Sequence, residues 1–285
     1  PLLCRLEKEE DAQGLKDLGY PMIEIVACNL YPFSDAAATE PPLDDLDLLE
    51  MVDIGGPTMV RASAKNHLNV VIACNPEDYS SIIEELKSGS VSLETRRNLA
   101  LKAYEHTATY DSAISNELAS RWNGLPEESD DTEEQSRRLP ATMTVAAHRK
   151  LHLRYGENSH QAAALYVDPG AVEGETLVTA KVEGNKAMSY NNYSDADATL
   201  RLCRSLSTDE WPETPHACVI VKHNNPCGAA LGKTQLEAYE AALASDPESA
   251  FGSIICVNEP VTVEFAQALG SLFVEVLMAP AYEKG

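Results

Sequence analysis

Two ionisable side chains stand together in the segment VIVKHNNPCG, residues 219–228. The three β-branched residues at its start predict a buried strand, and Lys222 and His223 follow at the end of that strand. A histidine can accept a proton near neutral pH. A neighbouring lysine can stabilise a negatively charged oxygen, and it disfavours the charged imidazolium. We therefore expect a proton-transfer site at this strand end, presented to a cleft by a turn over Pro226–Gly228.

The strand sets a geometric condition on this pair. Adjacent side chains of a strand point to opposite faces, so Lys222 and His223 can serve one site only if the strand bends there. The Asn-Asn-Pro sequence that follows favours such a bend. The alternative interpretation is an exposed loop without a catalytic role, because a Lys-His pair alone is a weak motif.

A second candidate group lies in the first quarter of the chain. The strand-like run MIEIVACNLY ends at Tyr31, and DIGGPTMVRASAKN joins Asp53 to a glycine pair and a helix that Pro57 would begin. That helix places Arg61 and Lys65 at i,i+4 spacing on one face. These residues allow acid–base chemistry, but Tyr31 could also pack at a strand end, and the two cations could form a solvated helix face.

A zinc deaminase is an alternative interpretation of the second half of the chain. Such enzymes need an HxE motif followed by PCxxC. Here Ala230 stands where the second cysteine would follow Cys227, and His216 begins the sequence HAC, which has no glutamate. The sequence therefore disfavours a zinc deaminase.

The segment HRKLH is a second possible metal site. On a helix, His148 and His152 would have the i,i+4 spacing that can hold zinc. No third ligand follows at a suitable spacing, so we expect no metal and interpret the segment as a linker. No P-loop or GxGxxG motif is present either, which argues against a nucleoside-triphosphatase or a dinucleotide enzyme.

The charge composition limits the partners. The chain has 45 acidic and 22 basic residues and a formal net charge of −23. Such a surface repels nucleic-acid backbones and anionic lipids, and no apolar run approaches the ~20 residues of a membrane span. We expect neither nucleic acid nor membrane as a partner, and an anionic substrate needs a local positive pocket.

The seven cysteines indicate a reducing compartment. None has CxxC spacing, and several lie in apolar strand-like runs, so we interpret them as small buried hydrophobic residues of a cytoplasmic protein. The chain begins with PLLCRLEKEE, without an initiator methionine or a signal sequence. We expect an internal fragment of a longer protein.

Strand-like and helix-like segments alternate along the chain, which predicts an α/β fold with a parallel sheet. The segment NGLPEESDDTEEQSRRLPATM, residues 123–143, interrupts this pattern because it is acidic, polar and punctuated by prolines. We interpret it as a loop before a domain boundary, with domains at 1–145 and 146–285.

Eight segments resemble, in order, those of the AICAR transformylase/IMP cyclohydrolase family of bifunctional purine-biosynthesis enzymes. They are CNLYPF, DIGGPTMVRASAKNH, SLETRRNLALKAYEHTATYD, LRYGENSHQAAALY, SYNNYSDADATLRL, VKHNNPCGAA, SDPESAFGSIICVNEPV and FVEVLMAP. The resemblance covers nearly the whole chain. It implies a methylglyoxal-synthase-like α/β domain followed by part of a cytidine-deaminase-like transformylase domain.

The resemblance implies two reactions, of which the second is dehydrative closure of formyl-AICAR to IMP. A carboxamide nitrogen attacks a formyl carbonyl, which needs a proton acceptor, a charge stabiliser and a proton donor to the departing water. By resemblance Lys65 is the proton donor and acceptor, and Tyr31 and Asp53 orient and polarise the reacting groups. The residues that would contact the nucleotide are Cys28, Asn29 and Ile54.

The first reaction implied is formyl transfer from 10-formyltetrahydrofolate, as co-substrate, to the 5-amino group of AICAR. His223 matches the residue that takes the proton, and Lys222 matches a residue that stabilises charge. The residues that match the family's substrate contacts are Arg154, Tyr155, Phe251, Gly252 and Glu275. The family also implies a homodimer with the nucleotides AICAR, formyl-AICAR and IMP as ligands. The alternative from a different class is a catalytically incomplete nucleotide-binding or dimerisation fragment.

Overall fold

The computed structural model describes residues 1–123, 141–174, 176–184, 186–206 and 210–283. Most of the acidic loop expected at 123–143 lies outside these residues. The chain divides into two compact units, Pro1–Ala147 and His148–Gly285, here called the N-terminal and the C-terminal unit. The division falls two residues beyond the boundary expected at 145/146.

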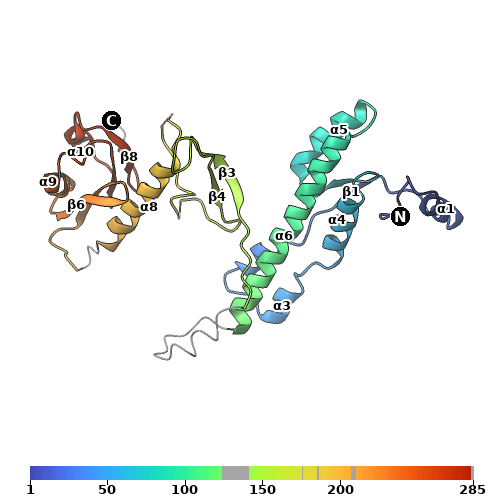
Figure 1. Ribbon diagram of the computed structural model, residues 1–285. Helices are drawn as coiled ribbons and strands as arrows, with labels where there is room; N and C mark the ends of the chain where they lie inside the picture. The colour runs from blue at the N-terminus through green and yellow to red at the C-terminus, as the bar shows by residue number, and fades with distance from the viewer. Residues whose placement is uncertain (124–140, 175, 185, 207–209, 284–285) are drawn as a thin grey trace. The chain divides into compact units, whose positions relative to one another are not determined.

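The N-terminal unit consists of short strands and helices that lead into one long helix (Figure 1). Its elements are α1 (Glu9–Asp17), β1 (Ile25–Ala27), α2 (Phe33–Ala37), α3 (Asp45–Leu49), α4 (Gly55–Lys65), β2 (Val71–Ala73), the 3-10 turn η1 (Pro76–Asp78), α5 (Tyr79–Lys87) and α6 (Leu93–Asn123).

β1 and β2 form a parallel pair in which Ile25 lies opposite Val71. The chain between them includes α4, so the strand–helix–strand alternation of the sequence corresponds to a parallel crossover, as such pairs require. An α/β organisation with a parallel strand pair is thereby confirmed.

Helix α4 begins two residues earlier than the sequence predicts. We expected Pro57 at its first position, but the helix starts at Gly55. Proline fits the third position equally well, because the first four amide groups of a helix have no intrahelical acceptor to lose. The Asp53 carboxylate accepts the Gly56 N–H at 2.7 Å and so stabilises this start.

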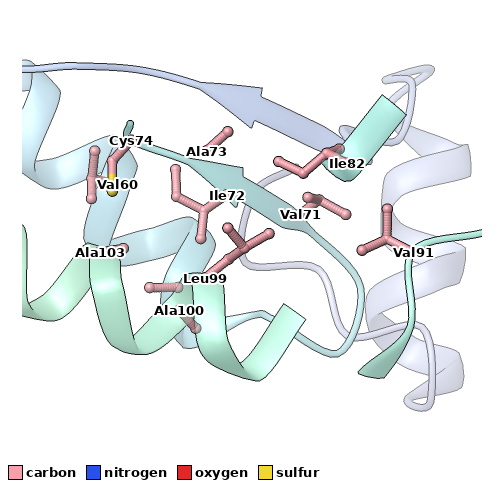
Figure 2. Close-up of a cluster of buried hydrophobic side chains, with 11 residues drawn as sticks. Val60, Val71, Ile72, Ala73, Cys74, Ile82, Val91, Leu99, Ala100 and Ala103 are labelled. Carbon is pink, nitrogen blue, oxygen red and sulfur yellow. The ribbon is translucent and has the colours of Figure 1, made fainter. Parts of the chain in front are cut away.

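The core of the N-terminal unit forms around β2 (Figure 2). All three residues of β2 are buried, as expected of a strand covered on both faces. Val60 and Ala64 of α4 pack against this cluster. Helix α6 contributes residues at helical spacing, which are Leu99, Ala100 and Ala103. The two helices that carry or border the candidate residues are therefore fixed by a common core.

The C-terminal unit contains a β-hairpin pair followed by a four-stranded sheet with helices (Figure 1). Its elements are β3 (His148–His152), β4 (Ala164–Val167), α8 (Tyr190–Ser205), β5 (His216–Lys222), β6 (Asn225–Gly232), α9 (Gln235–Ser245), β7 (Ser253–Val257), α10 (Val263–Leu269) and β8 (Val274–Met278).

The sheet has the strand order β6-β5-β7-β8 and is mixed, because β5 runs antiparallel to β6 and β7 while β7 and β8 are parallel. Alternate residues of β5 enter different clusters. Cys218 and Ile220 pack with α9 and α10, whereas Val219 and Val221 pack with α8. Because β5 is covered on both faces, every residue of the run before Lys222 is apolar, without the polar alternation of a half-exposed strand.

The segment HRKLH is a strand, not a linker. It forms β3 and pairs antiparallel with β4, with His148 opposite Val167 and His152 opposite Ala164. Both histidines are exposed. The helical i,i+4 spacing that could have held a metal is therefore not realised.

Gly228 allows β6 to approach α9. A Cβ at this position would overlap the backbone carbonyl of Ala242, which cannot rotate away as a side chain could. We expect Gly228→Ala to lower the free energy of unfolding by about 1–3 kcal/mol through overpacking, measured by urea denaturation of the full-length protein. The neighbouring exposed Ala229 gives the control Ala229→Ser. Equal stability of the two variants would contradict this packing.

Candidate functional site

A pocket with a volume of about 230 Å³ lies between the segment after β1 and helix α6. Among the residues proposed by resemblance, Asn29 and Tyr31 line it. Its other walls come from the chain after Asn29 and from one face of α6. These residues are Leu30, Pro32, Phe33, Ser34, Asp35, His106, Thr109 and Tyr110.

The amide of Asn29 is held by two contacts. Its Oδ1 accepts the Leu30 N–H at 2.8 Å and lies 3.1 Å from Nε2 of His106. Because an amide oxygen only accepts, Nε2 of His106 must carry the hydrogen of this bond. Burial lowers the pKa of His106 below the ordinary histidine value of 6.5, so at pH 7 the ring is neutral and Nδ1 is its unprotonated nitrogen.

Asp53 is tied to the same part of α6. Its N–H donates to Oη of Tyr110 at 2.7 Å, and the Tyr110 hydroxyl donates to the carbonyl of Met51 at 3.1 Å. Burial raises the pKa of Tyr110, which keeps the hydroxyl protonated for this role. A Cβ on Gly56 would overlap the Asp53 carboxylate and lie 2.9 Å from Leu30 Cδ2. Gly56, the second residue of the glycine pair, thus makes room for this carboxylate.

The remaining residues expected to contact the nucleotide differ in exposure. Tyr31 is 55% and Ile54 is 76% exposed. Cys28 is half-buried, and its thiol donates to the carbonyl of Asn29 at 3.4 Å. Burial and, to a smaller extent, the charge of Asp53 raise the pKa of Cys28. Cys28 therefore stays a thiol at neutral pH and offers a polar contact, not a nucleophile.

Lys65 stands apart from this group. It is the last residue of α4, whose first turn lies against Asp53. At 1.5 Å per residue, the 11 residues of this helix span about 15 Å. The structure therefore brings Asn29, Tyr31 and Asp53 together with His106 and Tyr110, whereas Lys65 lies at the other end of α4 from Asp53.

Lys222 is the last residue of β5, and a tight turn begins at His223. β5 and β6 are joined by the two residues His223 and Asn224, with φ of 53° and 60°, and Lys222 pairs with Asn225 across the hairpin. Positive φ at both central residues is the signature of a type I′ turn. The turn expected at Pro226–Gly228 is therefore wrong, because these residues belong to β6.

The sequence PCG accommodates a bulge instead of a turn. Val221 pairs with Pro226 and Ile220 with Gly228, so Cys227 is an extra residue in β6. Proline is tolerated at such a position because a bulge removes the need for a ladder N–H. The bend required for Lys222 and His223 to share a site is thus present, but it ends at Asn224, two residues before the proline.

Lys222 connects the hairpin to the loop before β7. Its Nζ donates to the carbonyl of Phe251 at 2.8 Å. Gly252 follows with a φ of 74°, which favours glycine, and its N–H donates to the carbonyl of Phe273 at 2.7 Å. The rings of Phe251 and Phe273 lie 5.6 Å apart. Phe251 is 60% exposed, so it offers one face to a ligand.

Glu275 on β8 is paired rather than free. Its Oε2 lies 2.8 Å from Nζ of Lys186, and the same ammonium lies 5.7 Å from the ring centroid of Phe273. Lys186 therefore belongs to the surroundings of Gly252 and Phe251 through Phe273. A substrate that binds to Glu275 would have to compete with Lys186 or bind beside it.

Arg154 and Tyr155 are held at the start of α8. The guanidinium of Arg154 stacks on the Tyr155 ring at 4.9 Å. The Arg154 N–H donates to the carbonyl of Met188 at 3.2 Å, and the Tyr190 N–H donates to the carbonyl of Tyr155 at 3.1 Å. The same helix carries Asp195, whose carboxylate accepts backbone hydrogen bonds from the His223-Asn224 turn.

Four of the residues at these sites were not found from the sequence. They are His106, Tyr110, Lys186 and Asp195. His106 and Tyr110 are four residues apart on α6, so helical periodicity could have placed them on one face. Nothing in the sequence signals Lys186 or Asp195, because their contacts join segments that are 89 and 28 residues apart.

Neither a candidate metal site nor a membrane-spanning helix occurs in the described residues. In residues 1–123, 141–174, 176–184, 186–206 and 210–283, no group of three or more His, Cys, Asp or Glu side chains could hold a metal ion. Within the same ranges, no helix is both long and apolar enough to span a bilayer.

Comparison with known proteins identifies relatives. The family model AICARFT/IMPCHase bienzyme matches residues 63–285. The bifunctional purine biosynthesis protein PurH of Persephonella marina (strain DSM 14350 / EX-H1) is 46% identical over 284 residues, which are 99% of this chain and 51% of that protein. The crystal structure of ForH is 33% identical with a TM-score of 0.37, over 41% of this chain and 61% of that chain. This chain spans about half the length of the curated relative it matches.

Proposed function

This chain belongs to the AICARFT/IMPCHase bienzyme family, and from that membership we propose that it serves the two last chemical steps of IMP formation. The first is formyl transfer from 10-formyltetrahydrofolate to AICAR, and the second is dehydrative closure of formyl-AICAR to IMP. The observation that supports this most is the family match over residues 63–285. The C-terminal unit would serve the transfer and the N-terminal unit the closure.

For ring closure, the pocket between the segment after β1 and α6 offers suitable groups. The carboxamide nitrogen must lose a proton as it attacks the formyl carbon, and the carbonyl oxygen must gain protons before it leaves as water. Asn29 would bind the nucleotide through its amide, and Tyr31 would polarise the reacting groups. Asp53, beside the first turn of α4, would orient the reacting carboxamide and formamide groups of the substrate. Lys65 remains the proposed proton donor and acceptor by resemblance alone.

For formyl transfer, the turn between β5 and β6 carries the reacting groups. The 5-amino group of AICAR attacks the formyl carbon of the folate, which gives a tetrahedral species with a negatively charged oxygen. His223 would take the proton from the attacking amine. The ammonium of Lys222, held at 2.8 Å from the Phe251 carbonyl, would stabilise the oxygen. Collapse then releases tetrahydrofolate and leaves formyl-AICAR.

The substrate contacts of this second site would come from the loops around it. Arg154 and Tyr155 would bind AICAR, with the guanidinium as the anion partner. Phe251 would provide a flat apolar wall, and Gly252 a backbone contact. Glu275 would bind a substrate hydrogen beside the ammonium of Lys186.

The finer assignments of fold and assembly complete the proposal. The N-terminal unit would have the methylglyoxal-synthase-like fold, and the C-terminal unit would be part of a cytidine-deaminase-like domain. The protein would work in the cytoplasm as a homodimer with AICAR, formyl-AICAR and IMP as ligands. Sedimentation of the full-length protein tests the dimer, and a monomer at working concentration would contradict it.

The deciding experiment compares this chain with the full-length protein in both reactions. Formyl-AICAR conversion to IMP and 10-formyltetrahydrofolate-dependent formylation of AICAR are each followed by absorbance. We expect both activities in the full-length protein. If the full-length protein catalysed neither, the proposed function would be wrong. If only the full-length protein were active, this chain would serve only in nucleotide binding or dimerisation.

His106 gives a separate prediction for ring closure. If it serves to fix the Asn29 amide, His106→Ala should lower kcat/KM for closure about 10-fold, the value of one lost hydrogen bond. His106→Gln should retain more activity, because its amide nitrogen can still donate to Asn29. Steady-state closure rates between pH 5 and pH 8 measure both variants. Equal losses in both, together with disappearance of the acidic limb of the wild-type profile, would instead make His106 a base.

A further inference from the structure

The backbone of the His223-Asn224 turn is held by one carboxylate from another element. Asp195 lies in the second turn of α8. Its Oδ1 accepts the Asn224 N–H at 2.7 Å, and its Oδ2 accepts the His223 N–H at 3.3 Å. Both amide groups of the turn therefore have the same anionic partner, 28 and 29 residues away in the sequence.

This contact explains how two ordinary residues occupy a turn that favours glycine. His223 and Asn224 have φ of 53° and 60°, a region that is sparsely populated by L-residues although histidine and asparagine enter it more often than most. Successive amide groups in such a turn point to one side and form a concave anion site. The Asp195 carboxylate fills that site and so stabilises the left-handed conformation.

Further contacts fix the turn from other directions. Ser194, beside Asp195 on α8, donates its hydroxyl to Oδ1 of Asn224 at 3.1 Å. The Asn225 side-chain amide donates to the carbonyl of His223 at 2.8 Å. These bonds leave the backbone of His223 with partners on both its N–H and its C=O.

The His223 ring depends on this backbone for its place. The side chain is exposed, and in the part of the chain that the structure describes no hydrogen bond holds the imidazole itself. With no ring partner, the Cα–Cβ direction that the turn imposes determines which volume the imidazole can reach. A change of turn conformation would therefore move the ring without touching any substrate contact.

We propose that Asp195 is a positioning residue for His223, which holds the left-handed turn and thereby the imidazole in place for proton transfer. The inference rests on the proposed formyl transfer and adds a residue to it. Asp195 contacts neither reacting group in this arrangement. It acts only through the two backbone amides that it accepts.

The test uses Asp195→Ala in the full-length protein. We expect kcat for formyl transfer to fall about 10–100-fold, the range for misplacement of a reacting group, while KM for AICAR stays within about twofold. Ring closure in the same polypeptide should be unchanged, and the retained KM for AICAR serves as the measure that the C-terminal unit is folded. Asp197→Ala is the matched control, because Asp197 lies on the same helix but pairs with Arg201 at 2.9 Å.

A rescue distinguishes positioning from general damage. Glycine adopts positive φ without steric cost, so adding Asn224→Gly to Asp195→Ala should restore at least about half of the lost activity on a logarithmic scale. An Asp195→Ala variant that keeps wild-type kcat, or a double variant with no recovery, would overturn the proposal.

A second measurement does not need catalysis. Amide hydrogen exchange at His223 and Asn224 should accelerate at least about 10-fold in Asp195→Ala, because both amides lose their acceptor. Unchanged exchange would refute the role of Asp195. If wild-type protein lacked formyl transfer, the proposed function would fail, and the exchange result would still decide whether Asp195 holds the turn.

Discussion

Replacement of His223 by alanine is expected to lower kcat for formyl transfer about 10²–10⁴-fold and to leave ring closure unchanged. This range is the usual contribution of a positioned acid–base group. His223 lies in the turn after β5, in the C-terminal unit, whereas the pocket proposed for closure lies in the N-terminal unit. Steady-state rates of both reactions in the full-length protein provide the measurement.

The control for this variant is a second histidine of the same unit. His160 is exposed and belongs to no site proposed here, so His160→Ala should leave both reactions at the wild-type rate. A His223→Ala protein that still transfers the formyl group at the control rate would remove His223 from the mechanism. Loss of closure along with transfer would indicate a folding defect and would contradict the separation of the two sites.

Lys65→Ala is expected to lower kcat for ring closure about 10²–10⁴-fold and to spare formyl transfer. The amine is the proton donor and acceptor that family resemblance assigns, and alanine removes it while the helix is retained. Lys65 is exposed at the end of α4, so the substitution creates no cavity. Closure of formyl-AICAR under saturating conditions gives kcat, and its dependence on concentration gives KM.

The structure makes this second prediction a strict test. Lys65 and Asp53 lie at opposite ends of a helix of about 15 Å, so a nucleotide that contacts both side chains must extend along α4. Lys87→Ala is the matched control, because Lys87 also ends a helix and is exposed. If Lys65→Ala closed the ring at the wild-type rate, Lys65 would be only a solvated residue of the helix face. His106 would then be the strongest remaining candidate for the base.

The elements of the fold could largely be predicted from local pattern. The apolar run before Lys222, the helix after the glycine pair and the alternation of strand and helix predicted observed elements, because each is determined by burial of its own residues. The start of α4 was misplaced because Pro57 is acceptable at several first-turn positions. HRKLH was misread because five residues with two histidines carry no period that separates strand from linker.

The turn after β5 shows where local pattern fails. Pro226 and Gly228 are typical turn residues, yet the chain turns at His223 and Asn224 instead. Two effects from outside the hairpin decide this: Asp195 stabilises the left-handed backbone, and the approach of α9 requires a glycine at 228 for packing. Neither is visible within ten residues of the turn.

The candidate sites were predicted only in part for the same reason. Family resemblance selected Asn29 and Asp53, but their hydrogen-bond partners on α6 are 77 and 57 residues away. Only the folded chain shows that His106 and Tyr110 complete these contacts. It likewise shows that Lys65 lies at the far end of its helix, which a list of matched residues does not reveal.

The extra residue at Cys227 constrains how this hairpin can change in length. With Cys227 in place, Gly228 faces α9 while the tight turn stays at His223 and Asn224. Deleting or inserting one residue in β6 would exchange the inward and outward faces of everything after it, which would drive a side chain into the Ala242 backbone. In sequences derived from this one, single substitutions in the hairpin can therefore be tolerated individually. An insertion or deletion of one residue would require a compensating change in α9.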